Sequence, residues 1–162
     1  MAKLKIVTGE DNKILRTVCK PVQKFDAKLK KFAKDLKQTM EAANGLGIAA
    51  PQVGETIRVF IATMNVNAKD ERQVLMVNPT VTLVGSKIVT DEEGCLSLPG
   101  IFGKVPRHDR VEVEFFGVDG ARQCLKLKGL NARVVQHEND HINGILFLDR
   151  MKKGVAGENL LI

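Results

Sequence analysis

The chain of 162 residues contains no tryptophan and no tyrosine, and it has only three cysteines and three histidines. Without aromatic side chains among its basic residues, it lacks the pattern typical of single-stranded nucleic-acid binding, and no specific nucleic-acid motif is recognisable. The odd number of cysteines fits a reducing compartment. There is no apolar run of the kind found in signal peptides or membrane spans. We therefore expect a cytoplasmic protein with no membrane partner.

A single domain over residues 1–162 is the simplest organisation, because the sequence shows no Pro/Ser-rich linker, no repeat and no low-complexity segment. A chain of this length can bury a substantial core. Apolar residues at helical spacing between Leu29 and Met40 predict a helix over 26–43. Strands dominate the middle of the chain, and a second helix follows, which indicates the α+β class. The predicted strands are 57–63, 72–78, 80–89, 111–117 and 122–128.

Two of the three histidines, His137 and His141, are four residues apart, and Glu138 lies between them. On a helix this spacing places both imidazoles on one face, with the carboxylate at its border. The pattern is HExxH, in which two metal ligands and a general base share one helical turn. Apolar residues at helical period through the segment, and the stop signal Asn143-Gly144, support a helix. The competing interpretation is an amphipathic core helix whose histidines are satisfied by hydrogen bonds.

Two histidines do not complete a catalytic metal site, because such sites use three protein ligands and keep one position for water. The extended HExxHxxGxxH motif would end at position 147, where this chain has Phe147. Glu158 is a downstream candidate, but it lies near the C-terminus, where chain ends usually fray. Cys95, in the acidic loop predicted over 91–100, is the stronger candidate. An isolated cysteine is more often a small buried apolar residue, but beside a two-ligand site we favour a ligand.

The segment from Gly45 to Ala50 matches G-x-G-x-x-A, a pattern found in dinucleotide-binding loops. That fingerprint requires a strand before the glycines and a helix after them. Here a helical stripe precedes the loop, Pro51 disfavours helical conformation at the residue before it, and a strand follows. The order is wrong for a nucleotide site. A loop of small residues instead allows an extended backbone to approach closely, and Gln52 adds a side-chain amide at its end.

Three separate segments together resemble the signature motifs of peptide deformylases, and they occur in the family's order at compatible spacing. These segments are Gly45–Gln52, Glu93–Ser97 and Gln136–His141. The resemblance extends from the N-terminal region to about Met151. It implies the deformylase architecture, with mixed, mostly antiparallel sheets around a central metal-binding helix.

The resemblance implies a metal-dependent hydrolase that removes the N-formyl group from N-formyl-methionyl nascent peptides and releases formate. Glu138 would take a proton from the attacking water and return it to the leaving amine. The side-chain amide of Gln52 and the backbone N–H of Leu96 would stabilise the oxyanion. The metal ligands would be Cys95, His137 and His141.

The resemblance also implies where the peptide binds. The backbone of the substrate would pair with the Gly47 region like an added strand. An apolar pocket near Leu46, Val134 and His137 would hold the methionine side chain. Asp91 either adjoins this pocket or points to solvent.

The metal cannot be chosen from the ligands alone, since a Cys/His/His set suits zinc, iron, cobalt or nickel. The resemblance implies one Fe²⁺ per chain as the physiological ion, with Zn²⁺, Ni²⁺ or Co²⁺ able to substitute. A thiolate beside ferrous iron should make the site sensitive to oxidation.

Charged residues near the motifs leave two questions open. Glu93 and Arg107 either form an ion pair that fixes the Cys95 loop or are unrelated surface charges. Asp140 either orients a metal ligand or is a carboxylate on the helix surface. The remaining cysteines, Cys19 and Cys124, are expected to be packing or surface residues.

The net charge of +6 arises largely around the first helix. The lysines concerned are Lys24, Lys28, Lys30, Lys31, Lys34 and Lys37. We favour a solvated polar face, and the functional alternative is a transient association with the ribosome.

Two rival functions remain from the sequence. One is a metallopeptidase of another kind with Glu158 as third ligand, and the other is a non-catalytic, deformylase-like binding module. Intact Glu138, Gln52 and Cys95 argue against the second. Formylated and unformylated peptides would separate the first from a deformylase.

Overall fold

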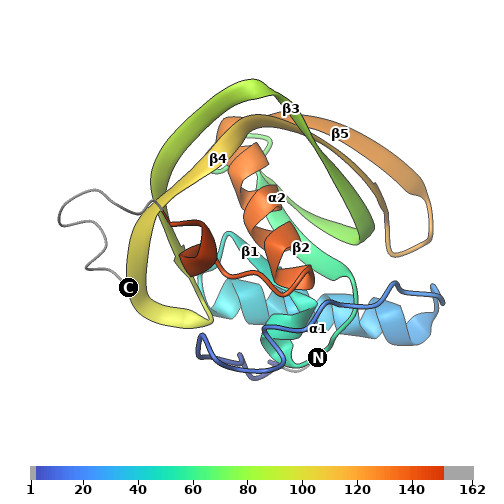
Figure 1. Ribbon diagram of the computed structural model, residues 1–162. Coiled ribbons are helices and arrows are strands. Elements are labelled where there is room, and N and C mark those ends of the chain that lie inside the picture. The colour runs from blue at the N-terminus through green and yellow to red at the C-terminus, as the bar shows by residue number, and fades with distance from the viewer. Residues whose placement is uncertain (1–2, 152–162) are drawn as a thin grey trace.

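The computed structural model describes residues 3–151, and Glu158 lies outside them. Two helices lie on opposite sides of a curved sheet (Figure 1). The helices are α1 (Ala27–Ala42) and α2 (Gly129–Ile142), with short 3-10 turns η1 (Ala50–Val53) and η2 (Phe147–Arg150). The strands are β1 (Gly47–Ala49), β2 (Val59–Met64), β3 (Arg72–Cys95), β4 (Leu98–Phe116) and β5 (Arg122–Lys128). The predicted α+β class is therefore confirmed.

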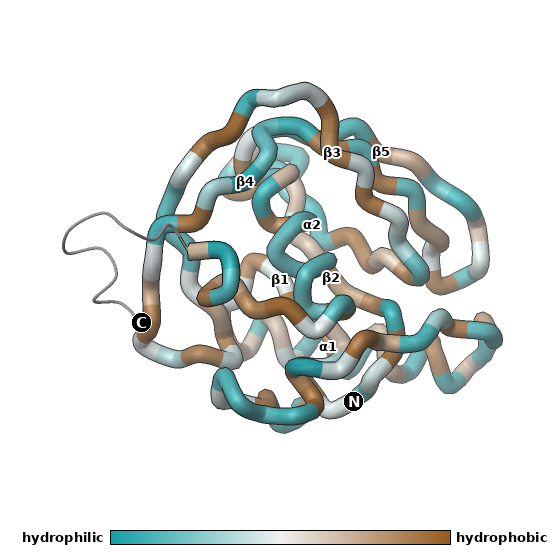
Figure 2. Tube along the Cα trace, in the orientation of Figure 1, coloured by the Kyte–Doolittle hydropathy of each residue, from teal (hydrophilic) through white to brown (hydrophobic). Residues whose placement is uncertain are grey.

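The strands form one five-stranded sheet in the order β1-β2-β3-β4-β5, so each strand pairs with its neighbours in sequence. All pairings between these strands are antiparallel, and the parallel contact in the described residues is a single bridge between Lys20 and Ile57. Hydrophobic and hydrophilic residues alternate along much of the curved strands (Figure 2). This alternation is what a sheet with two different faces requires.

Strand β2 shows how the core is divided, because all its residues are buried. Successive side chains of a strand point to opposite faces. Phe60 and Ala62 join the cluster under α2, whereas Val59 and Ile61 join the cluster under α1. The sheet is thus covered on both faces at β2, and α2 lies at the centre of the molecule (Figure 1).

Helix α1 forms where the sequence predicts it. Asp26 is its N-cap, and the Asp26 carboxylate accepts a hydrogen bond from the Leu29 N–H at 3.0 Å, which satisfies one free donor of the first turn. Leu36 and Met40 are fully buried. All six lysines named above are exposed, as expected for a solvated face.

Three predictions about the strands need correction. The strands predicted as 72–78 and 80–89 are one strand, β3, with an irregularity where Pro79 lacks a donor and Asn78 has a positive φ of 50°. The strand predicted as 111–117 is only the end of β4. The segment predicted as an acidic loop around Cys95 is the end of β3, followed by a two-residue turn.

The other two cysteines behave as expected. Cys19 is buried in the cluster under α2, and Cys124 is exposed on β5. Burial raises the pKa of the Cys19 thiol to about 11, and the charge of Arg58 offsets this only in part.

Candidate active site

Helix α2 presents His137 and His141 on one face, as the four-residue spacing predicts. Their ring centroids are 5.0 Å apart. The helix ends at Ile142 with Asn143 as its C-cap, and Gly144 takes a positive φ of 74° that favours glycine. Phe147, at the position where the extended motif would have a histidine, is buried and stacks on the His137 ring with centroids 6.1 Å apart.

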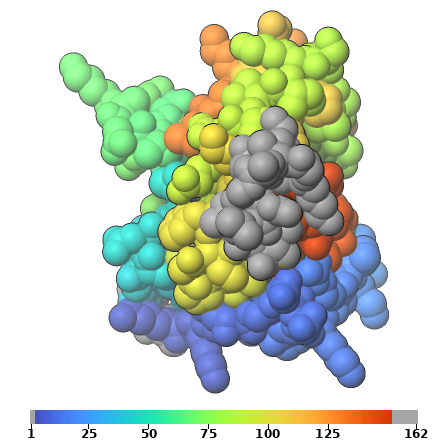
Figure 3. Space-filling view, turned by 60° about the vertical axis from the view of Figure 1, so that its left-hand side comes forward, coloured from blue at the N-terminus to red at the C-terminus, as the bar shows by residue number. Residues whose placement is uncertain are grey.

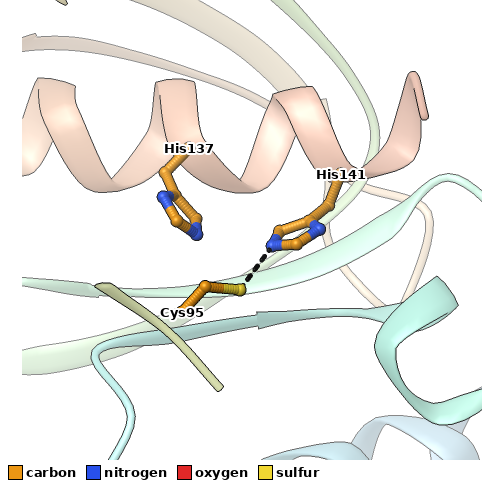
Figure 4. A group of neighbouring side chains, drawn as sticks. All are labelled: Cys95, His137 and His141. Carbon is orange, nitrogen blue, oxygen red and sulfur yellow. Dashed lines mark hydrogen bonds between the residues drawn. The ribbon is translucent and has the colours of Figure 1, made fainter. Parts of the chain in front are cut away.

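Cys95 reaches the two histidines from the sheet. It is the last residue of β3, where a tight turn of Leu96 and Ser97 joins β3 to β4. Its Sγ lies 3.3 Å from Nε2 of His141, and the three side chains point toward one another (Figure 4). One ligand atom from each of the three lies within 4.8 Å of the others. A thiol and two imidazoles that converge in this way fit a zinc- or iron-type ion and leave further coordination positions for water or substrate.

The surroundings of the two imidazoles shift their pKa values in opposite directions. Burial alone would lower the pKa of His137, but the Cys95 sulfur and the Glu93 carboxylate raise it well above its usual value. Burial, reinforced by the charge of His137, lowers the pKa of His141 well below its usual value. A metal ion at this site therefore competes with a proton on His137.

Glu138 is buried beside these three side chains. Its Oε1 has no hydrogen-bond partner within residues 3–151. Burial is the main cause that raises the pKa of this carboxyl to about 7. Gly47 of β1 lies directly against it, since a Cβ built on Gly47 would be 2.5 Å from Glu138 Oε2. The glycine loop therefore allows the Glu138 side chain of α2 to approach the β1 backbone closely.

Gln52, on η1, uses its two amide atoms differently. Its Oε1 accepts a hydrogen bond from the buried Ala49 N–H at 2.9 Å, which closes the glycine loop. Its Nε2 donates to Ser97 Oγ at 3.1 Å and lies 3.6 Å from Cys95 Sγ. The amide is thus a loop cap through oxygen and a donor at the candidate metal site through nitrogen.

A pocket of about 550 Å³ opens beside this group, and Cys95, His137 and Glu138 line it. Leu46, Gly47 and Val134 are also in its wall, together with the half-exposed Leu130 and Phe102. Asp91 is exposed and is not in the wall, whereas its neighbour Glu92 is.

Of the two alternatives for Glu93 and Arg107, the structure shows the ion pair, which is buried and has two hydrogen bonds of 2.9 Å. The Glu93 carboxylate also accepts from Arg133 at 2.7 Å and lies 2.8 Å from Nδ1 of His137. Burial opposes ionisation of Glu93, but Arg107 and His137 outweigh it and hold the pKa well below the usual range. Asp140 binds Arg107 at 2.6 Å, so it reaches the metal ligands only through this network.

Known proteins match nearly the whole chain. The model of the polypeptide deformylase family matches residues 3–156. The peptide deformylase of Brucella suis biovar 1 is 44% identical over 140 residues, which are 86% of this chain and 80% of that protein. The chain belongs to the peptide deformylase family. Its members remove the formyl group from N-formyl-methionyl nascent peptides, and they are metal-dependent hydrolases of protein biosynthesis.

Solved deformylase structures share the fold closely. The crystal structure of the peptide deformylase from Thermotoga maritima has a TM-score of 0.87 and 37% identity, and covers 94% of this chain and 99% of that chain. A class I type b peptide deformylase from Acinetobacter baumannii, with Met-Ala-Ser bound, has a TM-score of 0.85 and 36% identity, and covers 93% and 100%. Within residues 3–151, no helix is long and apolar enough to cross a membrane.

Sequence reasoning missed two polar residues of this deformylase site. Arg133 looks like a polar member of α2, yet it is buried and also donates to the carbonyls of Val105 and Val89 on β4 and β3. Ser97 is fully buried and accepts from Gln52. Their position near the metal motifs is visible in the sequence, but their partners are brought to them only by the folded sheet.

Proposed function

We propose that Cys95, His137 and His141 bind one metal ion, and that residues 1–162 act as one catalytic domain that deformylates N-formyl-methionyl peptides at this ion. The observation that carries the proposal is the convergence of a thiol and two imidazoles beside a buried carboxylate, at the wall of a pocket large enough for a side chain. A bound divalent metal lowers the pKa of water from 15.7 towards about 7 and polarises a carbonyl oxygen.

Glu138 is the general base and then the general acid in this proposal. It accepts the proton of the water that attacks the formyl carbon, and it returns a proton to the nitrogen that leaves as the peptide's α-amine. A pKa of about 7 for its carboxyl supports exchange of a proton in both directions near neutral pH. Its burial and its unpaired oxygen leave it available for this task.

Gln52 and Leu96 are the proposed donors to the oxyanion that develops on the formyl oxygen. The Gln52 amide nitrogen is directed towards Cys95 and Ser97, and its orientation is fixed by the bond from Ala49. Leu96 is the first residue of the turn after Cys95, so its backbone is next to the ligand. One such donor typically contributes about 2.7–4 kcal/mol to transition-state stabilisation.

The peptide substrate is proposed to extend the sheet at β1. Among the strands of residues 3–151, β1 pairs only with β2, which leaves one of its edges without a strand partner, next to Gly47. The methionine side chain would enter the pocket between Leu46 and Val134. The Met-Ala-Ser complex of the Acinetobacter baumannii relative supports this kind of occupant.

Fe²⁺ is the proposed physiological ion, with Zn²⁺, Ni²⁺ or Co²⁺ as substitutes, because the thiolate and imidazole donors accept all four. We also propose a cytoplasmic location and a transient contact with the ribosome through the exposed lysines of α1. Cosedimentation with ribosomes that is lost at high salt would support this contact.

The function is tested by assay of anaerobically purified protein with formyl-Met-Ala-Ser and, as a control, acetyl-Met-Ala-Ser, together with metal analysis. We expect release of formate, little reaction with the acetyl peptide and one metal ion per chain. Cleavage of a peptide bond in unformylated peptides would instead indicate a metallopeptidase. Metal binding without hydrolysis of any peptide would indicate a binding module.

A further inference from the structure

A continuous chain of ion pairs connects His137 to the molecular surface. Nδ1 of His137 lies 2.8 Å from the Glu93 carboxylate, which Arg107 binds with two hydrogen bonds of 2.9 Å. The third nitrogen of Arg107 donates to Asp140 at 2.6 Å. Arg150 binds the same carboxylate through Nε at 2.6 Å and Nη2 at 2.9 Å. The first four residues are nearly inaccessible, whereas the Arg150 side chain is 44% exposed.

Each member of this chain has its orientation fixed by the next. The planar guanidinium of Arg107 divides its donors between Glu93 on one edge and Asp140 on the other. Arg150 grips both oxygens of Asp140, a bidentate geometry that restricts rotation of the carboxylate. Without Arg150, the charge of the buried Asp140 carboxylate would be poorly compensated, because Arg107 would be its one remaining cation. The carboxylate would then attract Arg107 alone.

We propose that Arg150 is a positioning residue for the metal centre, which holds Asp140 against Arg107 and thereby fixes the Glu93 carboxylate that orients His137. A carboxylate on the distal nitrogen of a ligating imidazole sets the tautomer and the direction of the ligating nitrogen. The inference rests on the proposed role of His137 as a metal ligand. It does not depend on which reaction the site catalyses.

The surroundings of Arg150 provide a matched control. Its neighbour Asp149, on the same 3-10 turn, forms a second ion pair with Arg16 at 2.5 Å, and within residues 3–151 neither side chain of this pair has a hydrogen bond to Asp140 or Arg107. The N-terminal segment lies beside this turn (Figure 3). Loss of Arg16 therefore removes a contact that holds η2 in the same place, but Asp140 keeps its bonds to Arg107 and Arg150.

The experiment measures the affinity of the apo-protein for Co²⁺ by competition with a chelator, together with the visible spectrum of the bound ion. Arg150→Met should weaken Co²⁺ binding by about tenfold, the lower end of the range for outer partners of metal ligands, and alter the spectrum. Arg150→Lys, which keeps the charge but not the bidentate grip, should lie between. Arg16→Met should stay within about threefold of the parent, because an exposed pair contributes little.

A double-mutant cycle tests the route. If Arg150 acts through Asp140, Arg150→Met should add less than about twofold to the loss caused by Asp140→Asn. If Arg150→Met lowered the Co²⁺ affinity of Asp140→Asn by a further tenfold, Arg150 would not act through Asp140. If Arg16→Met lost as much Co²⁺ affinity as Arg150→Met, the cause would be a displaced η2. A lower Tm of Arg150→Met or Arg150→Lys with unchanged Co²⁺ affinity would overturn the proposal. Tight Co²⁺ binding by the parent without deformylation would count against the proposed function and not against this inference.

Discussion

Glu138 is the residue on which the proposed proton transfers depend. Glu138→Ala should retain the metal, since the three ligands are unchanged, but should lose about 10²–10⁴-fold in kcat/KM. The measurement is formate release together with metal content. Asp91→Ala, which removes an exposed acid near Cys95, should retain the parent rate. If Glu138→Ala kept a rate within a few-fold of the parent, another group would have to carry the proton.

Gln52 combines two tasks that substitutions can separate. Gln52→Leu should lower kcat by about 10²–10³-fold with nearly unchanged KM, because an oxyanion donor acts in the transition state. It should also destabilise the protein by about 1–3 kcal/mol, since the buried Ala49 N–H loses its acceptor. Gln52→Glu keeps an acceptor for that N–H and loses the donor. It should therefore retain more thermal stability than Gln52→Leu while its kcat remains low.

A Gln52→Leu variant with reduced thermal stability and the parent kcat would leave only the capping role. The metal and the Leu96 N–H would then have to stabilise the oxyanion. Comparison of Tm with kcat in the two variants distinguishes these outcomes.

At this scale the sequence predicts the residue types of the site well. The spacing of His137 and His141, and a phenylalanine where the extended motif would place a histidine, point to Cys95, and the structure brings the three together. The double use of Gln52 could not be predicted, because it depends on which atoms Ala49 and Ser97 present. Arg133 was missed because a charged residue on a helix is usually solvent-exposed, and its carbonyl partners are distant in sequence.

At the level of elements, the close packing of β1 against α2 predicts a strict requirement for glycine at position 47. A Cβ there would lie 2.5–2.9 Å from Oε2, Cδ and Cγ of Glu138. Gly47→Ala should displace the carboxylate and lower kcat strongly, with metal content retained. Gly117→Ala is the control, since a Cβ there would meet the ends of the exposed Asp119 and Gln123 side chains, at 2.9 and 3.0 Å, away from the candidate site. Equal activity of the two variants would contradict this account.

The elements also show where sequence patterns are insufficient. Helix α1 and strand β5 were predicted to within one residue, because capping and alternation are local signals. The long strands β3 and β4 were predicted only in part. Pro79 interrupts one pattern, and Pro99, Gly100 and Pro106 obscure the other. Pairing between the two strands keeps them extended, and that partner is not encoded locally.

For the whole molecule, metal binding and stability should be coupled, because the ligands come from β3 and α2 and converge only in the folded state. Free metal at about 100 times its Kd should stabilise the fold by about 2.7 kcal/mol. For a chain of this size that corresponds to roughly 5–10 °C in Tm. Thermal unfolding of the apo-protein with and without Co²⁺ measures the shift. Cys95→Ala should abolish most of it, and an equal shift in that variant would place the ion elsewhere.

The order in which the ligands occur along the chain has a consequence for synthesis. Cys95 ends β3, whereas His137, His141 and Arg150 follow only after β4 and β5. On a translating ribosome, which adds about 5–20 residues per second, the thiol therefore emerges several seconds before the helix that will surround it. During that interval the cysteine lacks both neighbouring histidines and is open to oxidants. A reducing environment therefore matters during the synthesis of each enzyme molecule as well as after it has folded.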